Sequence, residues 1–176
     1  MYITKDMLTQ FTGKFPGEDD SYIDRYLNAA EEKVRGYLGY SPEQGEYSQT
    51  VRGEGTDILV LKAPVIEITG VSIDGTEQTG LTGWEAEKNY VRLWKNNVPQ
   101  VFAKGVPYTL TYRGGLEEVP QVIVQTALQI ADLFWESAGG NLAVNSTSFA
   151  DSGTRVFNNF KCDRFLEQIN EYRIYG

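Results

Sequence analysis

The chain has 176 residues, of which 41% are hydrophobic, 23% are charged and 12% are aromatic, which is the composition of a globular protein. It can bury one sizeable core with one small added subdomain, but not two large independent domains. Because it has no histidine and a single cysteine, Ser-His-Asp catalysis, Cys-His catalysis, a Cys/His zinc site and an intrachain disulfide are all excluded.

The formal net charge of −8 opposes non-specific binding to nucleic acid, which depends on neutralising phosphates. The same acidity would keep DNA from adhering to a surface that it slides past, although solubility alone is the simpler explanation. The apolar runs are too short to span a bilayer, and the N-terminus lacks the regions of a signal peptide. We therefore expect a protein that is made and used in a cytoplasm, with no membrane partner.

Two helices are predicted at the start of the chain. Thr4 caps the first, in which Met7, Leu8 and Phe11 share one face. The second begins near residues 19–21 and ends before Gly39. Its apolar residues recur at three- and four-residue steps and form one stripe of about five turns: Tyr22, Ile23, Tyr26, Leu27, Ala30, Val34, Tyr37 and Leu38.

The middle of the chain changes to short runs of strand-forming residues separated by turn formers. The Asp74-Gly75 pair after residues 71–73 is a hairpin signal, because both positions of such a tight turn take a positive φ. We expect one small antiparallel sheet from residues 47–52, 58–61, 65–73, 90–94 and 108–112.

A third helix is predicted to begin at Pro120, whose missing N–H costs nothing in the first turn of a helix. Its apolar face extends to Trp135 and is wider than a surface helix needs, which indicates the central core helix. Residues 141–153 are rich in Asn, Ser, Thr and Gly and predict an extended loop. A last helix is expected over residues 159–173, with Phe165, Leu166 and Ile169 on one face.

Five motifs could carry chemistry, and each has a simpler explanation. The acidic run Glu18-Asp19-Asp20 and the pair Glu117-Glu118 precede helices, where carboxylates favour the positive end of the helix dipole. Gly53-Glu54-Gly55 is a turn and not a dinucleotide fingerprint. Asn145-Ser146-Thr147 matches the glycosylation pattern without a signal peptide, and Cys162 is expected to pack. The sequence therefore predicts no enzyme, no metal and no cofactor.

Eleven tyrosines and three tryptophans could stack bases, bind sugars or fill interfaces between subunits. Base-stacking surfaces need basic residues between the rings, and this chain is acidic. Tyrosine and tryptophan are enriched where partly wet protein surfaces meet, so we interpret them as core and interface residues. A small carbohydrate-binding module built on the β region remains the alternative from a different functional class.

Three stretches, in chain order, resemble the family of phage head-tail connector proteins, also called adaptor or head-completion proteins, in its larger form with a β insertion. Residues 61–75, LKAPVIEITGVSIDG, look like the family's strand-Pro-strand hairpin. Residues 108–120, YTLTYRGGLEEVP, are similar to its passage from a strand into the core helix. Residues 165–173, FLEQINEYR, are similar to its closing L-x-x-Y-R motif.

The resemblance implies an α+β subunit: a small bundle of about four helices with an inserted antiparallel β subdomain. Residues 1–43 and 116–176 would form the body of a ring, the latter with the core helix, the extended loop and the C-terminal helix. Residues 44–115 would form the insertion.

The resemblance also implies a homo-oligomeric ring, usually of twelve subunits, in the virion neck. The ring docks on the portal protein and is followed by a stopper or tail-completion protein, and DNA passes through its lumen without specific binding. Another neck or tail-completion protein is the alternative within the same class. The expected oligomer or portal contacts are Phe157, Phe160, Phe165, Leu166, Ile169, Tyr172 and Arg173.

Overall fold

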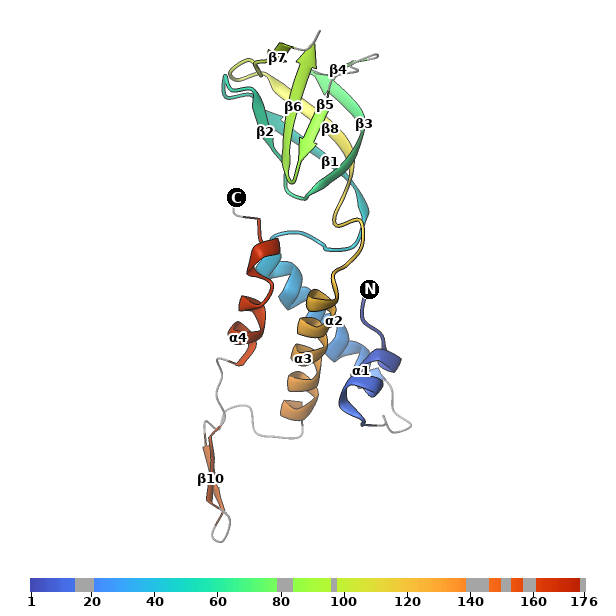
Figure 1. The fold of residues 1–176 in the computed structure, drawn as a ribbon, viewed down its shortest axis with the longest axis vertical. Helices are drawn as coiled ribbons and strands as arrows, with labels where there is room; N and C mark the ends of the chain where they lie inside the picture. The colour runs from blue at the N-terminus through green and yellow to red at the C-terminus, as the bar shows by residue number, and fades with distance from the viewer. Residues whose placement is uncertain are drawn as a thin grey trace. The chain divides into compact units, whose positions relative to one another are not determined.

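The computed structural model describes residues 1–14, 21–78, 84–95, 98–138, 146–149, 153–156 and 161–174. The chain divides into two compact units. The helical unit comprises Met1–Leu38 and Val119–Arg173, and the β unit comprises Gly39–Glu118 with the chain end from Ile174. The fold class is α+β, as predicted, with helices and antiparallel sheets in separate units (Figure 1).

The helical unit contains α1 (Lys5–Thr12), α2 (Ser21–Leu38), α3 (Gln121–Ala138), α4 (Lys161–Glu167) and the short 3-10 helix η1 (Asn170–Tyr172). Thr4 caps α1 as predicted, because its side chain accepts a hydrogen bond from the Met7 N–H at 3.3 Å. Gly13, with φ of 67°, ends α1, and Gly39, with φ of 86°, follows the end of α2.

Helix α3 is the core of the helical unit and packs against each of the other three α-helices. It begins one residue after Pro120, whose carbonyl accepts hydrogen bonds from the Ile123 and Val124 N–H groups. The side chains that it buries occupy most of its circumference: Ile123, Val124, Thr126, Ala127, Leu128, Ile130 and Ala131. The prediction of a central core helix is therefore confirmed.

A buried carboxylate connects α2 to the segment that precedes α1. Glu31 is only 4% exposed, and its Oε1 accepts hydrogen bonds from the backbone N–H groups of Tyr2, at 2.7 Å, and Ile3, at 3.1 Å. Ile3 is itself fully buried. Glu31 therefore serves as an acceptor for backbone donors that would otherwise be buried without partners.

The β unit contains two four-stranded antiparallel sheets. Sheet A has the strand order β1 (Gly45–Arg52), β8 (Pro107–Gly114), β3 (Val65–Ile73) and β4 (Thr76–Glu77). In sheet B, β6 (Tyr90–Lys95) lies between β5 (Trp84–Glu87) on one edge and β2 (Ile58–Val60) with β7 (Val98–Gln100) on the other.

The core of the β unit lies between the two sheets, and sheet B is drawn in front of sheet A in Figure 1. Alternate residues of β8 are buried, and Tyr112 stacks on Tyr47 of β1 with ring centroids 5.3 Å apart. Leu59 and Val91 are the buried residues of β2 and β6. Each sheet therefore has one buried face and one outer face.

The strands expected from the sequence are present, including the hairpin at Asp74-Gly75, where φ is 49° and 77°. The single sheet that we expected is two sheets, because β2 and β6 pair with each other while β1 and β3 pair with β8, and strand pairing is not visible in local sequence. The sequence did not predict β4, β5 and β7, which lack runs of β-branched residues.

The C-terminal region also differs from the expectation. The predicted extended loop, residues 141–153, contains the short strand β9 (Ser146–Phe149), and its antiparallel partner β10 (Gly153–Val156) begins where that loop was expected to end. Thr, Val and Phe favour strands even in a polar segment. The predicted last helix is interrupted between α4 and η1 and ends at Tyr172.

Two glycines set the path by which the chain leaves sheet A. A Cβ on Gly114 would lie 2.9 Å from the Pro64 carbonyl oxygen, and one on Gly115 would lie 2.4 Å from that of Glu43. Gly115 also has φ of 111°, which side chains with a Cβ rarely adopt. The next residue donates its backbone N–H to the Pro42 carbonyl at 3.1 Å.

None of the described helices combines the length and the apolar character needed to cross a membrane.

Replacing Glu31 with alanine removes the acceptor of two backbone N–H groups, so we expect the free energy of unfolding to fall by about 2 to 3 kcal/mol. Glu32→Ala is the matched control, because Glu32 is exposed and forms a surface ion pair with Arg35, which contributes at most about 1 kcal/mol. Urea titrations followed by circular dichroism measure both values. Equal losses in the two variants would contradict the structural role of Glu31.

Candidate assembly interface

The C-terminal residues that the sequence analysis expected at an oligomer or portal contact differ in burial. Leu166 and Ile169 are 2% and 0% exposed, and the helix that carries Leu166, α4, packs on α3 of the same chain. Phe165 and Tyr172 are half-buried and Arg173 is exposed, so these three retain surface that a neighbour could contact. Phe157 and Phe160 lie outside the described residues.

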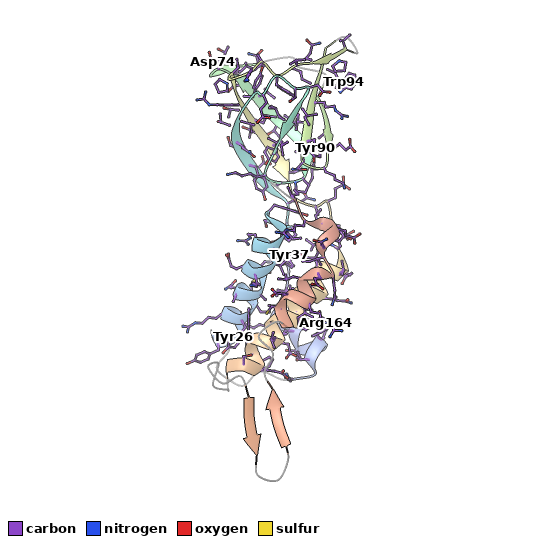
Figure 2. All side chains as sticks on the ribbon, turned by 90° about the vertical axis from the view of Figure 1, so that its left-hand side faces the viewer. Tyr26, Tyr37, Asp74, Tyr90, Trp94 and Arg164 are labelled. Atoms are coloured by element: carbon purple, nitrogen blue, oxygen red, sulfur yellow. The ribbon has the colours of Figure 1, made fainter. Side chains whose placement is uncertain are left out.

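Polar contacts attach η1 to α2 within the helical unit. The Tyr37 hydroxyl donates to Asn170 Oδ1 at 3.1 Å, and the Arg173 guanidinium lies 4.9 Å from the centre of the Tyr37 ring. Figure 2 labels Tyr37 on α2. The segment of α4 and η1 is therefore already packed on its own chain. A contact with another subunit would use the outer surface of this segment.

The groups that the sequence offered as candidates for chemistry do not form a reactive site among the described residues. Burial raises the pKa of the Cys162 thiol above its ordinary value, and the nearby Lys33 ammonium offsets only part of this, so the thiol is neutral near pH 7. Glu117 and Glu118 are exposed in the segment before α3. Residues 18–20 lie outside the described part of the chain. Among the described residues, no three His, Cys, Asp or Glu side chains are grouped as metal ligands would be.

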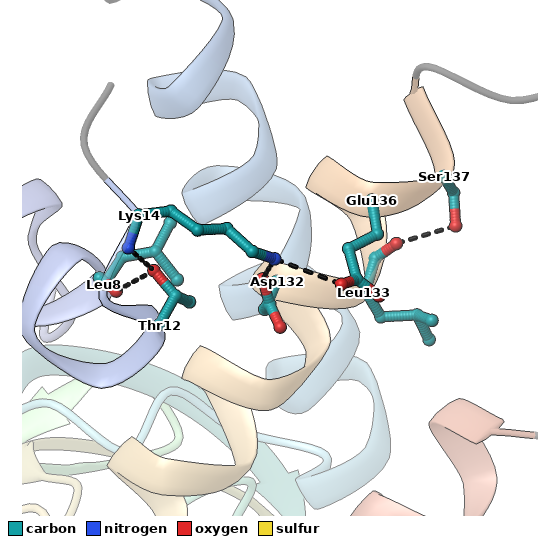
Figure 3. A network of polar contacts seen from close by, with 7 residues as sticks. All are labelled: Leu8, Thr12, Lys14, Asp132, Leu133, Glu136 and Ser137. Atoms are coloured by element: carbon teal, nitrogen blue, oxygen red, sulfur yellow. Dashed lines mark hydrogen bonds and ion pairs between the residues drawn. The ribbon is translucent and has the colours of Figure 1, made fainter. Parts of the chain in front are cut away.

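A network of polar contacts connects the end of α1 to α3 (Figure 3). Lys14 Nζ lies 2.7 Å from Asp132 Oδ1 and 3.1 Å from Glu136 Oε1, and its ammonium is 5.7 Å from the centre of the Trp135 ring. The hydrogen bonds to the two carboxylates raise the pKa of Lys14. Because it stays protonated at neutral pH, this lysine serves as an ion-pair partner and not as a base or nucleophile.

The outer face of sheet B carries an aromatic and apolar surface that the sequence did not reveal. We call it the Tyr90 face, and it consists of Ile58, Val60, Tyr90, Arg92 and Trp94. Tyr90, Arg92 and Trp94 are alternate residues of β6 and therefore share one side of the sheet. Val60 pairs with Tyr90 and Ile58 with Arg92 across the strands. Figure 2 labels Tyr90 and Trp94 at the two ends of this row.

Two large apolar side chains of the Tyr90 face are accessible to solvent. Tyr90 is 42% exposed and Val60 is 43% exposed, and the face surrounds one cation, Arg92. Its guanidinium lies 3.9 Å from the Asp57 carboxylate and 4.0 Å from that of Glu87, both at the margin of ion pairing. An aromatic and arginine centre with a charged rim is the composition of a protein–protein interface.

The alternation of Tyr90, Arg92 and Trp94 with Val91 and Leu93 is visible in the sequence and could have indicated two distinct faces of one strand. It could not say which face is covered, because every one of these residues except Arg92 is apolar or aromatic. Val91 is fully buried, whereas Tyr90 is exposed, and the position of sheet A decides between them.

Comparisons with known proteins identify solved structures with a similar fold. No protein-family model matches the chain, and no curated protein matches it. A chain in the neck of an empty gene transfer agent (GTA) particle, computed with C6 symmetry, is similar over 99% of this chain and 90% of that one, with a TM-score of 0.64 and 14% identity.

Two other solved chains have the same fold. One is in the virion of a native GTA particle, with a TM-score of 0.58, 15% identity and coverage of 92% of this chain and 81% of that one. The other is in the neck of a native GTA particle computed with C12 symmetry, with a TM-score of 0.55, 15% identity and coverage of 89% and 84%. At these identities the likeness establishes a shared fold.

Because Ile169 is fully buried within its own subunit, Ile169→Ala should lower the free energy of unfolding of the diluted, monomeric protein by about 2 to 5 kcal/mol. Gln168→Ala is the matched control, since Gln168 is the exposed neighbour. Denaturant titration of both variants gives the two values. If Ile169→Ala leaves the free energy of unfolding of the monomer unchanged, Ile169 packs on another subunit and not on its own.

Proposed function

We propose that this chain is a structural subunit of a head-tail connector in the neck of a phage or phage-like particle. One observation carries the proposal: the likeness to a neck protein of a GTA particle extends over 99% of this chain and includes both the helical and the β unit. A fold shared over its full length is stronger support than a likeness of one unit, because either unit alone could serve unrelated functions.

The proposed assembly is a ring of identical subunits, with twelve as the expected number. The similar neck proteins come from structures computed with C6 and C12 symmetry, which supports a ring. Ring closure requires that each subunit present two different surfaces to its two neighbours. We propose no catalytic group and no cofactor for this chain, because its proposed role is to contact neighbouring proteins in the neck.

The ring would dock on the portal protein and be followed by a stopper or tail-completion protein, with assembly in the cytoplasm of a host bacterium. In this proposal the outer surfaces of Phe165, Tyr172 and Arg173 make oligomer or portal contacts. Phe157 and Phe160, which lie outside the described residues, are proposed to contribute to the same contacts. The buried pair Leu166 and Ile169 would hold the C-terminal segment in place from beneath.

DNA would pass through the lumen of the ring without being bound. The chain has 24 acidic and 16 basic residues, so a ring accumulates negative charge with every subunit. Retention of DNA requires cations that neutralise phosphates, and a net acidic protein repels the duplex instead. The charge balance therefore fits a conduit better than a binding site.

Purified protein should form closed rings with a mass near twelve times the 19.8 kDa of one chain. Mass photometry gives the number of subunits, and negative-stain electron microscopy shows whether the assemblies are closed. A protein that stays monomeric at all concentrations and is retained by a glycan column would contradict the connector and support the carbohydrate-binding alternative.

The rings should leave duplex DNA unretarded in a gel at physiological salt, because the acidic subunits offer no net gain from counterion release. Lowering the salt should not produce binding either, since repulsion between like charges grows as screening falls. Salt-dependent retention of duplex DNA would contradict a passive lumen.

A further inference from the structure

Helix α1 is attached to the rest of the helical unit through little buried apolar surface. Leu8 is its buried side chain, whereas α3 is buried around most of its circumference. With eight residues, α1 is too short to be a stable helix in water by itself. It is therefore helical because it is docked on α2 and α3.

Ion pairs hold both ends of α1 against the neighbouring helices. At its start, Lys5 Nζ lies 3.3 Å from Asp24 Oδ2 of α2. Just after its end, Lys14 Nζ lies 2.7 Å from Asp132 Oδ1 and 3.1 Å from Glu136 Oε1, both on α3 (Figure 3). Each pair joins a cation of the N-terminal segment to a carboxylate of another helix, so charge contributes to docking at both ends.

The position of Lys5 indicates that its charge serves docking and not the helix itself. Lys5 is the first residue of α1, directly after the N-cap Thr4. A cation at this end is repelled by the positive end of the helix dipole, so an isolated α1 would be less stable for having it. The ion pair with Asp24, which exists only when α1 is docked, is the stabilising contact that Lys5 makes.

The ion pairs are open to solvent and therefore to screening by salt. The side chains of Lys14 and Glu136 are 41% and 60% exposed, and that of Asp24 is 52% exposed. The Debye length falls from about 10 Å at 0.1 M salt to about 3 Å at 1 M, which weakens pairs of this kind. Apolar packing of α2 on α3 does not depend on charge, so salt should loosen α1 selectively.

The chain just before α1 is held in a different way. Ile3 is fully buried, and its backbone N–H donates to Oε1 of Glu31, which is itself buried. Salt screens a buried contact much less than an exposed one. Ile3 is therefore an anchor that stays in place under conditions that weaken the ion pairs of α1.

We propose that α1, together with Gly13 and Lys14, is a flap that opens reversibly as the ionic strength rises, while Ile3 stays anchored and α2 stays packed on α3. The inference goes beyond the proposed function and does not depend on it, because every contact involved lies within one chain. Elements with few buried apolar contacts open at a lower free energy than the core. Opening uncovers the surface of α3 beside Asp132 and Glu136 without unfolding the helical unit.

Hydrogen exchange measured by mass spectrometry at about 0.05 M and about 1 M NaCl tests the flap. The reporters are the amides of residues 8–13, which include the Leu8 N–H bonded to the Thr4 carbonyl and the Gly13 N–H bonded to the Thr9 carbonyl. Fragmentation of the N-terminal peptide in the spectrometer separates these amides from that of Ile3. Rates are divided by those of an unstructured peptide at the same salt concentration, which gives a protection factor.

In the wild type, the higher salt concentration should lower the protection of residues 8–13 by about threefold to tenfold, while Ile3, α2 and α3 keep theirs. Lys14→Met removes two of the ion pairs and keeps the length of the side chain, so it should lower the same protection by a similar factor at low salt. Added salt should then change this variant less than the wild type.

Two further variants serve as controls. Lys14→Arg retains the positive charge and should retain both the protection and its salt dependence. Arg35→Met removes a cation of matched exposure, at 43%, which pairs with Glu32 inside α2, and it should leave α1 unchanged. Mass photometry under the same conditions shows whether all variants have the same state of assembly.

Four results would overturn the inference. Equal protection of α1, α2 and α3 at both salt concentrations would show that α1 is not a separate flap. A joint loss of protection in all three helices would indicate unfolding of the whole unit. A weakly protected α1 that responds neither to salt nor to Lys14→Met would show that the ion pairs do not hold it. Changes in α1 that occur only together with a change in mass would assign the contact to assembly.

Discussion

The backbone turn at Gly114-Gly115 is the constraint on which the rest of the structure depends. Strand β8 pairs with both β1 and β3, so it fixes the register of sheet A, and it is also the last strand before the core helix α3. A side chain at either glycine would collide with the Pro64 or Glu43 carbonyl oxygen, so only glycines let these segments lie against one another. A larger residue would displace the central strand of sheet A.

Helix α3 imposes the second constraint, because its apolar surface is too wide for one partner helix to cover. It is buried by α1, α2 and α4 together, and Lys14 and Glu31 fasten the N-terminal segments that complete the enclosure. The helical unit nevertheless leaves Phe11 and Tyr22 44% and 52% exposed, and the β unit leaves Val60 and Tyr90 43% and 42% exposed on the outer face of sheet B. Each unit therefore presents apolar side chains to the solvent.

The full-length likeness at 14% to 15% identity indicates what the fold requires of a sequence. Hydrophobic patterning, turn residues and glycines at tight approaches suffice to specify the path of the chain, while most individual side chains can differ. The fold does not impose the same requirement on the outer faces. The surface properties of this chain therefore follow from its own exposed residues, such as Tyr90 and Thr111.

The sequence by itself determined the helices, the main strands, the hairpin at Asp74-Gly75 and the central role of α3, because caps, turns and periodicity are local signals. It also excluded histidine-based chemistry. Only the tertiary structure decided that Leu166 and Ile169 are buried in their own subunit, that Glu31 binds backbone 28 and 29 residues away, and that Tyr90 faces solvent while Val91 does not. These outcomes depend on which distant segment covers a given face, and an apolar residue has the same appearance in sequence whether its cover is its own chain, another subunit or water.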